Sequence, residues 1–308
     1  MKEEILFTMK SPYRDDFKIH GFRFGEGEKT IAIVGAMRGD EVQQQFVCSQ
    51  IVKNLIEIEE AGKLIAGHEI LVIPSANHFS MNINKRFWAM DNTDINRMFP
   101  GYDKGETTQR IAAAIFEHVK DYKYGIQLAS FYMPGEFIPH VRMMDTGFQN
   151  IKLAKKFGLP YVLIRKPKPY DTTVLNYNWQ IFGTQAFSIY SGDTDTINKD
   201  TAKTAWTSIL RFMNNMKIIS QNKHEGHSSY ILKDSDLETI ISNQSGILYA
   251  LKGAGDEIKA GDLLAKILDP FTGETRSSIL APTDGTIFFA HHKPLIHQST
   301  VMFKIVRF

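Results

Sequence analysis

The sequence is short of cysteine, of net charge and of long apolar runs, and each shortage excludes a class of protein. Its single cysteine, Cys48, rules out a disulfide within the chain, which fits a reducing compartment. The formal net charge is only +2, so no strong field attracts nucleic acid or an acidic membrane. No segment reaches the roughly 20 apolar residues of a membrane helix, and the first residues show no signal peptide. We therefore expect a cytoplasmic protein that binds neither nucleic acid nor membranes.

The first 220 residues alternate between strand-like and helix-like patterns. Short apolar, β-branched runs predict strands at 30–36, 68–75, 124–130, 161–164 and 186–192. Apolar residues at helical spacing predict helices at 41–61, 106–120, 148–158 and 200–216. This alternation, with connections of this length, predicts an α/β domain with a mostly parallel sheet and helices on both faces.

The sequence changes character after residue 220. A polar linker is followed by short strands with glycine turns, which predicts a small all-β domain over 221–308 beside an α/β domain over 1–220. The stretch "SGILYALKGAGDEIKAGDLLAKI" resembles a biotinyl/lipoyl-type half-barrel. Carriers of that shape hold their cofactor on a lysine at a hairpin tip, but the equivalent turn here, "APTDGT", has none. We expect a packing or interface role instead, for example in a homo-oligomer.

Polar residues follow several of the predicted strands. Ligands of such sheets bind beyond the carboxyl ends of the strands, which places segments 38–41, 127–130 and 190–193 near one another. A long loop at 77–101 follows another strand and is rich in Asn, Arg and aromatic residues. A loop of this composition is more than a connector, so we expect it to contribute to the same site.

The loop carries the motif "TDINRMFPG" after "NKRF", and the chain here resembles the succinylglutamate desuccinylase/aspartoacylase family. These proteins are zinc-dependent deacylases related to the M14 carboxypeptidases. The resemblance implies an M14-like fold and a zinc ion held by two histidines and a carboxylate. It also implies a zinc-bound water whose proton is taken by a glutamate, and a substrate with an amide C–N bond.

Most of the family's catalytic positions hold other residues in this sequence. The first zinc motif, Gly-x-His-Gly-x-Glu, falls on "GAMRGDE", where Glu41 is retained but Arg38 replaces the histidine. The second falls on "IQLAS", with Gln127 at the aspartate and Ala129 at the other zinc histidine. Tyr190 stands at the position of the general-base glutamate. An arginine stays protonated and offers no lone pair to zinc, so no catalytic residue is assigned with certainty.

The substrate-binding side of the family is better preserved. Arg86, Asn96 and Arg97 match positions that hold a substrate's carboxylate and carbonyl, and arginine binds carboxylates through two parallel hydrogen bonds. Arg38 is either a further ligand-binding cation or an ion-pair partner of Asp40 or Glu41. The implied partner is a small carboxylate-bearing molecule such as an N-acyl amino acid.

Two functional interpretations follow from these substitutions. In the first, the protein is a non-catalytic or altered-activity relative that keeps a carboxylate pocket and needs no cofactor. In the second, it is a metal-dependent hydrolase of N-acyl amino acid amide bonds with a non-standard zinc site. Such a site would join Glu41 to a relocated ligand, His140, with His78 as a weaker candidate. His291, His292 and His297 predict adventitious metal binding at most.

Overall fold

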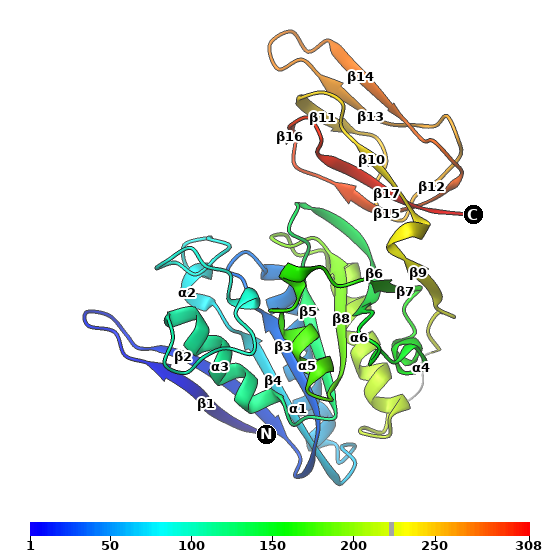
Figure 1. Ribbon diagram of the computed structural model, residues 1–308. Helices are drawn as coiled ribbons and strands as arrows, with labels where there is room; N and C mark the ends of the chain where they lie inside the picture. Colours follow the sequence, from blue (N-terminus) through cyan, green and yellow to red (C-terminus); the bar gives the residue numbers. More distant parts are fainter. Residues whose placement is uncertain (222–224) are drawn as a thin grey trace.

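The computed structural model describes residues 1–221 and 225–308 of the chain (Figure 1). The chain folds around a large mixed sheet with helices and ends in an antiparallel β region, as the sequence predicts. The predicted boundary between residues 220 and 221 adjoins residues 222–224, which lie outside the described part. Within the described part, no helix is long and apolar enough to cross a membrane.

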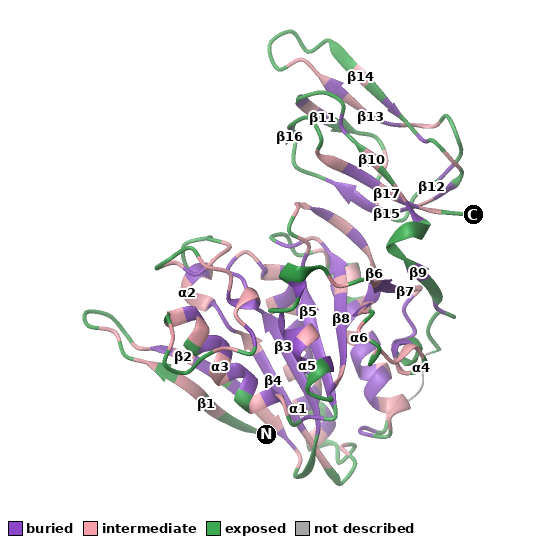
Figure 2. Ribbon diagram, in the orientation of Figure 1, coloured by how far each residue is buried: buried purple, intermediate pink, exposed green. Residues whose placement is uncertain are grey.

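Four parallel strands form the middle of the sheet. In spatial order they are β4 (Gly67–Ser75), β3 (Gly27–Ala36), β5 (Tyr124–Ala129) and β8 (Gln185–Gly192). Their apolar runs are buried, because helices cover both faces of the sheet (Figure 2). Because the four strands are parallel, their carboxyl ends lie at the same edge of the sheet. The predicted site residues follow the strands at this edge.

Two layers of helices enclose these strands. On one face lie α1 (Val42–Glu60) and α6 (Lys199–Asn215), which share a core cluster with the strands. The other face carries α3 (Thr107–Val119) and α5 (Leu175–Ile181), with a second core cluster. The short helical segments are α2 (His78–Met81), η1 (Ile95–Arg97), α4 (Ile151–Ala154), η2 (Lys155–Phe157), η3 (Pro169–Asp171) and η4 (Asp234–Asp236).

The sheet is larger than the sequence patterns suggest. An N-terminal hairpin of β1 (Lys2–Met9) and β2 (Phe17–Phe24) extends one edge, pairing antiparallel with β4. On the other side β6 (Gly135–Met144) pairs antiparallel with β8, and β7 (Tyr161–Arg165) and β9 (Tyr230–Lys233) follow it. The sheet is thus mixed, with a parallel centre.

The helix predicted at 148–158 is much shorter than expected. The Asn150 side chain accepts a hydrogen bond from the Leu153 N–H, so the helix begins at Ile151. Gly158 then ends the helical segment in the left-handed region with φ of 64°. The element is one α-helical turn followed by a 3-10 turn, because both end signals lie within this short stretch.

The C-terminal β region has two layers. The strands β10 (Leu237–Ile241), β12 (Glu257–Ile258), β15 (Gly285–His291) and β17 (Val301–Arg307) continue the large sheet. The strands β11 (Gly246–Ala250), β13 (Leu263–Leu268), β14 (Thr275–Leu280) and β16 (Leu295–Ile296) form a separate four-stranded sheet. All pairs are antiparallel, and a separate apolar core lies between the layers.

The β region is joined to the α/β part through its backbone and an aromatic cluster. Strand β15 pairs antiparallel with β6, where Phe289 lies opposite Phe137. Both rings belong to a small core cluster that also contains Leu163 and Phe288. Because this junction adjoins the end of β8, it positions the β region above the edge of the sheet that carries the predicted site (Figure 1).

Candidate functional site

The turn after β3 is built around the carboxylate of Glu41. Its Oε2 accepts hydrogen bonds from the backbone N–H groups of Met37 and Arg38, with N···O distances of 2.8 and 3.1 Å. Gly39 lies so close to α2 that a Cβ at this position would come within 2.5 Å of the Ser80 carbonyl carbon. The turn therefore needs glycine at this position, and the hydrogen bonds to the Glu41 carboxylate hold it together.

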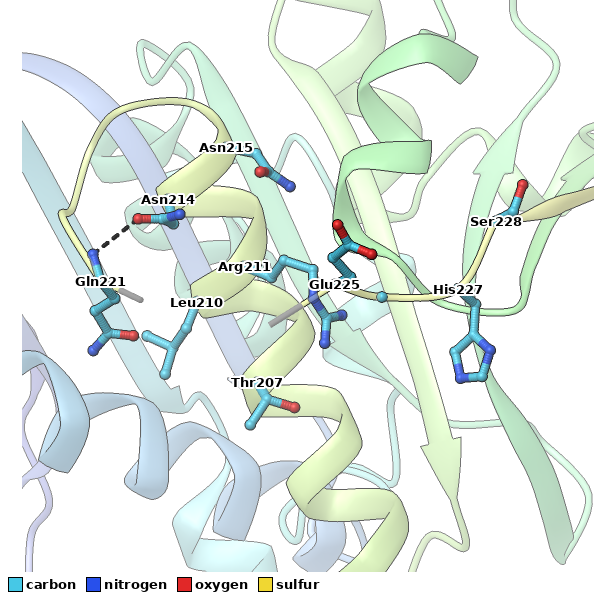
Figure 3. A pocket seen from close by; sticks show the side chains of 10 residues that line it. Thr207, Leu210, Arg211, Asn214, Asn215, Gln221, Glu225, His227 and Ser228 are labelled. Carbon is cyan, nitrogen blue, oxygen red and sulfur yellow. Dashed lines mark hydrogen bonds between the residues drawn. The ribbon is translucent and has the colours of Figure 1, made fainter. Parts of the chain in front are cut away.

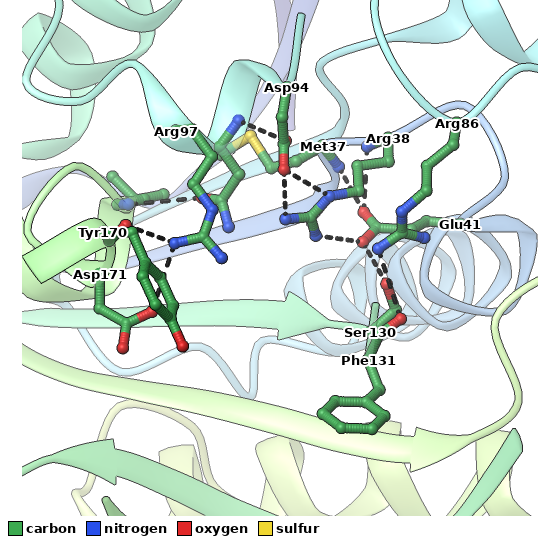
Figure 4. A network of polar contacts seen from close by, with 12 residues as sticks. Met37, Arg38, Glu41, Arg86, Asp94, Arg97, Ser130, Phe131, Tyr170 and Asp171 are labelled. Atoms are coloured by element: carbon green, nitrogen blue, oxygen red, sulfur yellow. Dashed lines mark hydrogen bonds and ion pairs between the residues drawn. The ribbon is translucent and has the colours of Figure 1, made fainter. Parts of the chain in front are cut away.

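Arg38 lies between two carboxylates in this turn (Figure 4). Its Nη1 donates to Glu41 Oε1 at 2.9 Å, and its Nε and Nη2 donate to Asp94 Oδ2 at 3.1 and 2.8 Å. Only 7% of the residue is exposed. Burial acts to lower the pKa of Arg38, but the charges of Glu41 and Asp94 outweigh it and raise the pKa above its ordinary value. Arg38 is thus a permanent, fully paired cation.

The residues around Glu41 do not fit the zinc ion that the sequence motif implies. The second Glu41 oxygen accepts from both Arg38 and the Ser130 hydroxyl, the latter at 2.5 Å, so both oxygens already have two donors. The guanidinium of Arg38 has no lone pair for a metal, and Ala129 presents only a methyl group. The donor set at this position is that of an ion-pair network.

Two of the predicted substrate-binding arginines are also engaged with the protein. Arg86 donates from Nη1 to both carboxylate oxygens of Asp40, at 3.0 and 2.8 Å, and from Nη2 to the Phe131 carbonyl. Arg97 donates to the Tyr170 carbonyl and, at 3.3 Å, to the Asp171 carboxylate. Both side chains lie at the cavity described below, but their charges are balanced by these neighbours.

Asn96 lies beside the amide that replaces a family aspartate. Gln127 donates to the Asn96 side-chain oxygen at 3.0 Å, and the backbone N–H of Leu175 donates to the same oxygen. The Asp94 side chain accepts from the Asn96 backbone N–H at 3.0 Å. The "DINR" motif therefore forms a rigid 3-10 turn that brings Asn96 and Asp94 to the end of β5.

Tyr190 and His140 are neighbours on adjacent strands. They lie opposite each other in the β6–β8 register, and their rings stack with centroids 5.3 Å apart. His140 donates from Nδ1 to the Ile138 carbonyl at 2.8 Å, so its Nε2 accepts from Arg142 Nη2 at 3.3 Å. Burial, and then the Arg142 charge, lower the pKa of His140 well below its usual range.

This arrangement bears on the alternative metal site with His140. Both ring nitrogens of His140 are engaged with protein groups, and the imidazole is completely buried. In the described part of the chain, the one group of side chains that could share a metal ion is Asp193, Asp195 and His292. His292 Nδ1 already lies 3.0 Å from an Asp193 oxygen, as in an ion pair. Glu41, His140 and His78 do not belong to that group.

A small cavity of about 90 Å³ lies at the end of β5 and β8, and we call it the inner cavity. Its lining includes all four predicted substrate-binding residues together with Ala129 and Tyr190. Arg142 and Asn176 are among the further lining residues that were not predicted from the sequence. The Arg142 Nε and the Asn176 Nδ2 are buried donors without a hydrogen-bond partner. Orphan buried donors are rare in proteins, and both of these residues line the inner cavity.

Arg142 differs from the other arginines that line the inner cavity in having no carboxylate ion pair. Among the described residues no acidic oxygen lies within 4.0 Å of its guanidinium, which packs 3.9 Å from the centroid of the Tyr190 ring. Its i+2 relation to His140 on one strand was the sequence signal for it, because such residues share a face. The apolar pattern at 135–144 does not predict a strand, so the sequence alone does not place Arg142 beside His140.

A second hollow, of about 490 Å³, lies along α6 and is lined by Thr207, Arg211, Glu225 and His227 among others (Figure 3). Arg211 donates to the Phe157 carbonyl at 2.7 Å. None of the residues predicted from the sequence to form the site lines this hollow. The geometry therefore concentrates the predicted residues at the inner cavity.

Comparisons with known proteins show the fold and the family of this chain. The model of the succinylglutamate desuccinylase/aspartoacylase catalytic domain matches residues 27–216. A succinylglutamate desuccinylase structure from Silicibacter sp. TM1040 aligns with a TM-score of 0.83 at 17% identity, covering 99% of this chain and 95% of that one. The product-bound ectoine utilization protein EutE from Ruegeria pomeroyi aligns with a TM-score of 0.78 at 16% identity, covering 95% and 90%.

An aspartoacylase family protein from Mesorhizobium loti aligns with a TM-score of 0.74 at 18% identity, over 95% of this chain and 90% of that one. No curated protein matches the chain significantly. At these identities the structures establish the fold alone, whereas the catalytic-domain model covers more than half of the sequence. The chain therefore belongs to the succinylglutamate desuccinylase/aspartoacylase family.

Proposed function

We propose that this protein is a binding relative of the family's deacylases, which holds a small carboxylate and does not hydrolyse amides through a zinc ion. The observation that carries the proposal is the Arg38 guanidinium, paired with both Glu41 and Asp94. A buried cation with two carboxylates balances the local charge that a metal ion would otherwise balance. Without a Lewis acid or a glutamate at Tyr190, the turn lacks the groups that activate water.

The inner cavity supplies the binding function. Arg142 and Asn176 offer buried donors without partners, and Asn96, Arg97 and Arg86 line the same space. A carboxylate would accept hydrogen bonds from these donors and offset the unpaired charge of Arg142. The ligand class that this chemistry supports is a small carboxylate-bearing molecule such as an N-acyl amino acid. With a single cysteine, Cys48, buried and free, we infer that the protein acts in the cytoplasm.

Metal content and turnover test this proposal directly. The purified protein should contain less than stoichiometric zinc by atomic emission, and should not hydrolyse N-acyl amino acids in a chelator-sensitive way. Stoichiometric zinc together with chelator-sensitive hydrolysis would establish the alternative, a metal-dependent amide hydrolase with a non-standard site, and would refute the binding function.

A motif-restoring variant sharpens the test. Arg38→His, Ala129→His and Tyr190→Glu together supply two imidazoles beside Glu41 and a carboxylate base. We expect this triple variant to bind zinc, because Glu41 is released from Arg38. The matched control keeps Arg38 and carries only Ala129→His and Tyr190→Glu, and it should bind no zinc at this position. Equal zinc binding by both variants would show that Arg38 is not what excludes the metal.

A further inference from the structure

A separate pocket of about 340 Å³ lies between α1, the strands β2 and β4, and the short helix α2. We call it the side pocket, and its lining residues are His20, Phe22, Gln45, Ser49, Val52, Pro74, Ser75 and His78. It has no lining residue in common with the inner cavity. Its volume is within the range of small-molecule sites, so the side pocket has room for a ligand of its own.

The walls of the side pocket follow from residue spacing on two elements. On α1, Gln45, Ser49 and Val52 stand at i, i+4 and i+7, so they lie on one face of the helix. On β2, His20 and Phe22 are two residues apart and share one face of the strand. Phe22 and Val52 are only partly buried against the core, and both contribute apolar surface to the pocket.

The lining of the side pocket is uncharged. Among the described residues no aspartate, glutamate, lysine or arginine belongs to it, although these types make up 23% of the chain. His20 is exposed, and its Nδ1 lies 3.0 Å from a Glu3 oxygen. Burial, and then the charge of His20, lower the pKa of His78, so its imidazole is neutral at pH 7. A charged ligand would lose hydration here without gaining a partner, which favours an uncharged one.

The hydrogen-bonding groups that remain available in the side pocket are acceptors. The Gln45 Oε1 is buried and has no hydrogen-bond partner in the described part of the chain. The Ser49 hydroxyl donates its proton to the Phe46 carbonyl at 2.7 Å. The Ser75 hydroxyl donates to the Met81 sulfur at 3.7 Å. A buried acceptor without a donor is unfavourable, so a ligand with an N–H or O–H group would be stabilised beside Gln45.

Aromatic rings form part of the side pocket and are held in position. Three of its eight lining residues carry such rings, namely His20, Phe22 and His78. The imidazole of His78 stacks on Phe17 with ring centroids 4.9 Å apart, and it meets the Phe79 ring edge-on at 5.2 Å. A fixed ring at a pocket wall packs well against another flat ring and loses little entropy on binding.

We propose that the side pocket binds an uncharged aromatic molecule that carries an N–H or O–H donor. The ring of this ligand packs against Phe22, Val52 and Pro74, and its donor group points to the Gln45 Oε1. The side pocket and the inner cavity select different ligands, because the first offers an unpaired acceptor and the second offers unpaired donors. The inference is therefore independent of the proposed carboxylate-binding function.

Two ring compounds that differ in one donor test the inference. The probes are indole, which has an N–H group, and 1-methylindole, which has none. In calorimetric titrations of the native protein we expect indole to bind roughly tenfold more tightly, as for one hydrogen bond to a buried acceptor. Equal affinity for the two compounds, or no binding of indole, would overturn the proposal.

Gln45→Met separates the lost hydrogen bond from steric exclusion of the added methyl group. Methionine has a similar length but only a weakly accepting sulfur. In this variant the two compounds should bind with nearly equal affinity, because the acceptor that distinguishes them is gone. A tenfold preference for indole that persists in the variant would show that Gln45 does not recognise the donor, and it would refute the proposed ligand class.

Ser49→Trp shows whether binding takes place in the side pocket. Ser49 is exposed at the pocket wall, so a tryptophan there fills the space without replacing a core residue. It should weaken indole binding by roughly tenfold or more. Glu57→Trp is the control, since it places the same ring at an exposed position of α1 outside the lining and should leave indole affinity unchanged. Equal indole affinities of these two variants would place the binding elsewhere and overturn the site.

Discussion

Arg38 is the residue on which the chemistry of the site depends. Its guanidinium joins Glu41, on the same turn, to Asp94, which is 56 residues away in the sequence. Glu41 is 1% exposed, so without the arginine its charge would remain in a buried position with fewer donors. Removing one member of such a buried ion-pair group lowers the free energy of unfolding, because the desolvation of the remaining charge is then no longer offset.

Replacing Arg38 with leucine should destabilise the fold by about 3–5 kcal/mol, the usual cost of breaking a buried pair. Urea unfolding at pH 7 measures the change. Arg276→Leu is a suitable control, since the Arg276–Asp269 pair at 2.6 Å is on the surface and its loss should cost less than about 1 kcal/mol. Equal, small effects of the two substitutions would contradict a structural role for Arg38.

His140 should make the stability depend on pH in mildly acid solution. Its pKa in the folded state is well below its usual value, chiefly through burial. Above the unfolded-state pKa of about 6.5, both states are neutral and the residue has no effect on stability. As the pH falls below that value, the unfolded chain binds a proton that the folded chain does not, so the free energy of unfolding decreases.

The measurement is urea unfolding between pH 5 and pH 8 for the native protein and for His140→Phe. Below pH 6.5, the free energy of unfolding should depend less steeply on pH in the phenylalanine variant. The difference in slope should be at most about 1.4 kcal/mol per pH unit, the value for one proton. Burial also lowers the pKa of His78 and His291, so part of the slope should remain in the variant. Identical slopes for both proteins would show that His140 is not held neutral by the fold.

Strand β6 is the element that connects the site to the β region. Its antiparallel pairing with β8 places His140 opposite Tyr190. Its pairing with β15 places Phe137 in one apolar cluster with Phe288 and Phe289. Gly135 begins this strand where the two backbones approach closely. A Cβ at Gly135 would come within 2.5 Å of the Ala290 carbonyl oxygen and the Phe289 ring.

Gly135→Ala should therefore destabilise the protein by about 1–3 kcal/mol, as overpacking of a close contact does. The control is Gly253→Ala, because no atom lies within 4 Å of a Cβ built there. Thermal unfolding of both variants gives the comparison. A Gly135 variant as stable as the Gly253 variant would mean that β6 and β15 can separate slightly without loss.

At the scale of the whole molecule, the large sheet runs through both parts of the chain. Strands from the α/β part and from the β region are neighbours in one hydrogen-bonded order, β8-β6-β15-β17. Phe137, Phe288 and Phe289 bury the junction between them. Parts joined by a continuous sheet and an apolar cluster are expected to unfold together, unlike parts that share only a polar surface.

Differential scanning calorimetry should accordingly show one transition, with calorimetric and van't Hoff enthalpies that agree. Phe288→Ala removes a fully buried ring from the junction and should lower the midpoint while bringing the two parts closer to separate unfolding. Two resolved transitions in the unaltered protein would show that the junction does not couple the parts.

The sequence by itself determined the central elements and the side chains that stand at the turn after β3 and at the ends of β5 and β8. The strands β3, β4, β5 and β8 and the helices α1, α3 and α6 follow from local apolar periodicity, which depends on near neighbours in the chain. That arginine, alanine and tyrosine stand at positions 38, 129 and 190 is a covalent fact, visible without any structure. The family membership followed from one loop motif and is confirmed by the match over residues 27–216.

Only the tertiary structure decided how the remaining side chains are used. The carboxylate of Glu41 accepts hydrogen bonds from several donors, and one of them is the hydroxyl of Ser130, 89 residues away. No local sequence pattern encodes that contact. The unpaired charge of Arg142 depends on which strands flank β6, and a cleft between the α/β part and the β region brings Arg165 together with Lys304 from a different part of the chain. Whether a charged side chain is balanced or free depends on partners that are distant in sequence, and these meet only when the chain has folded.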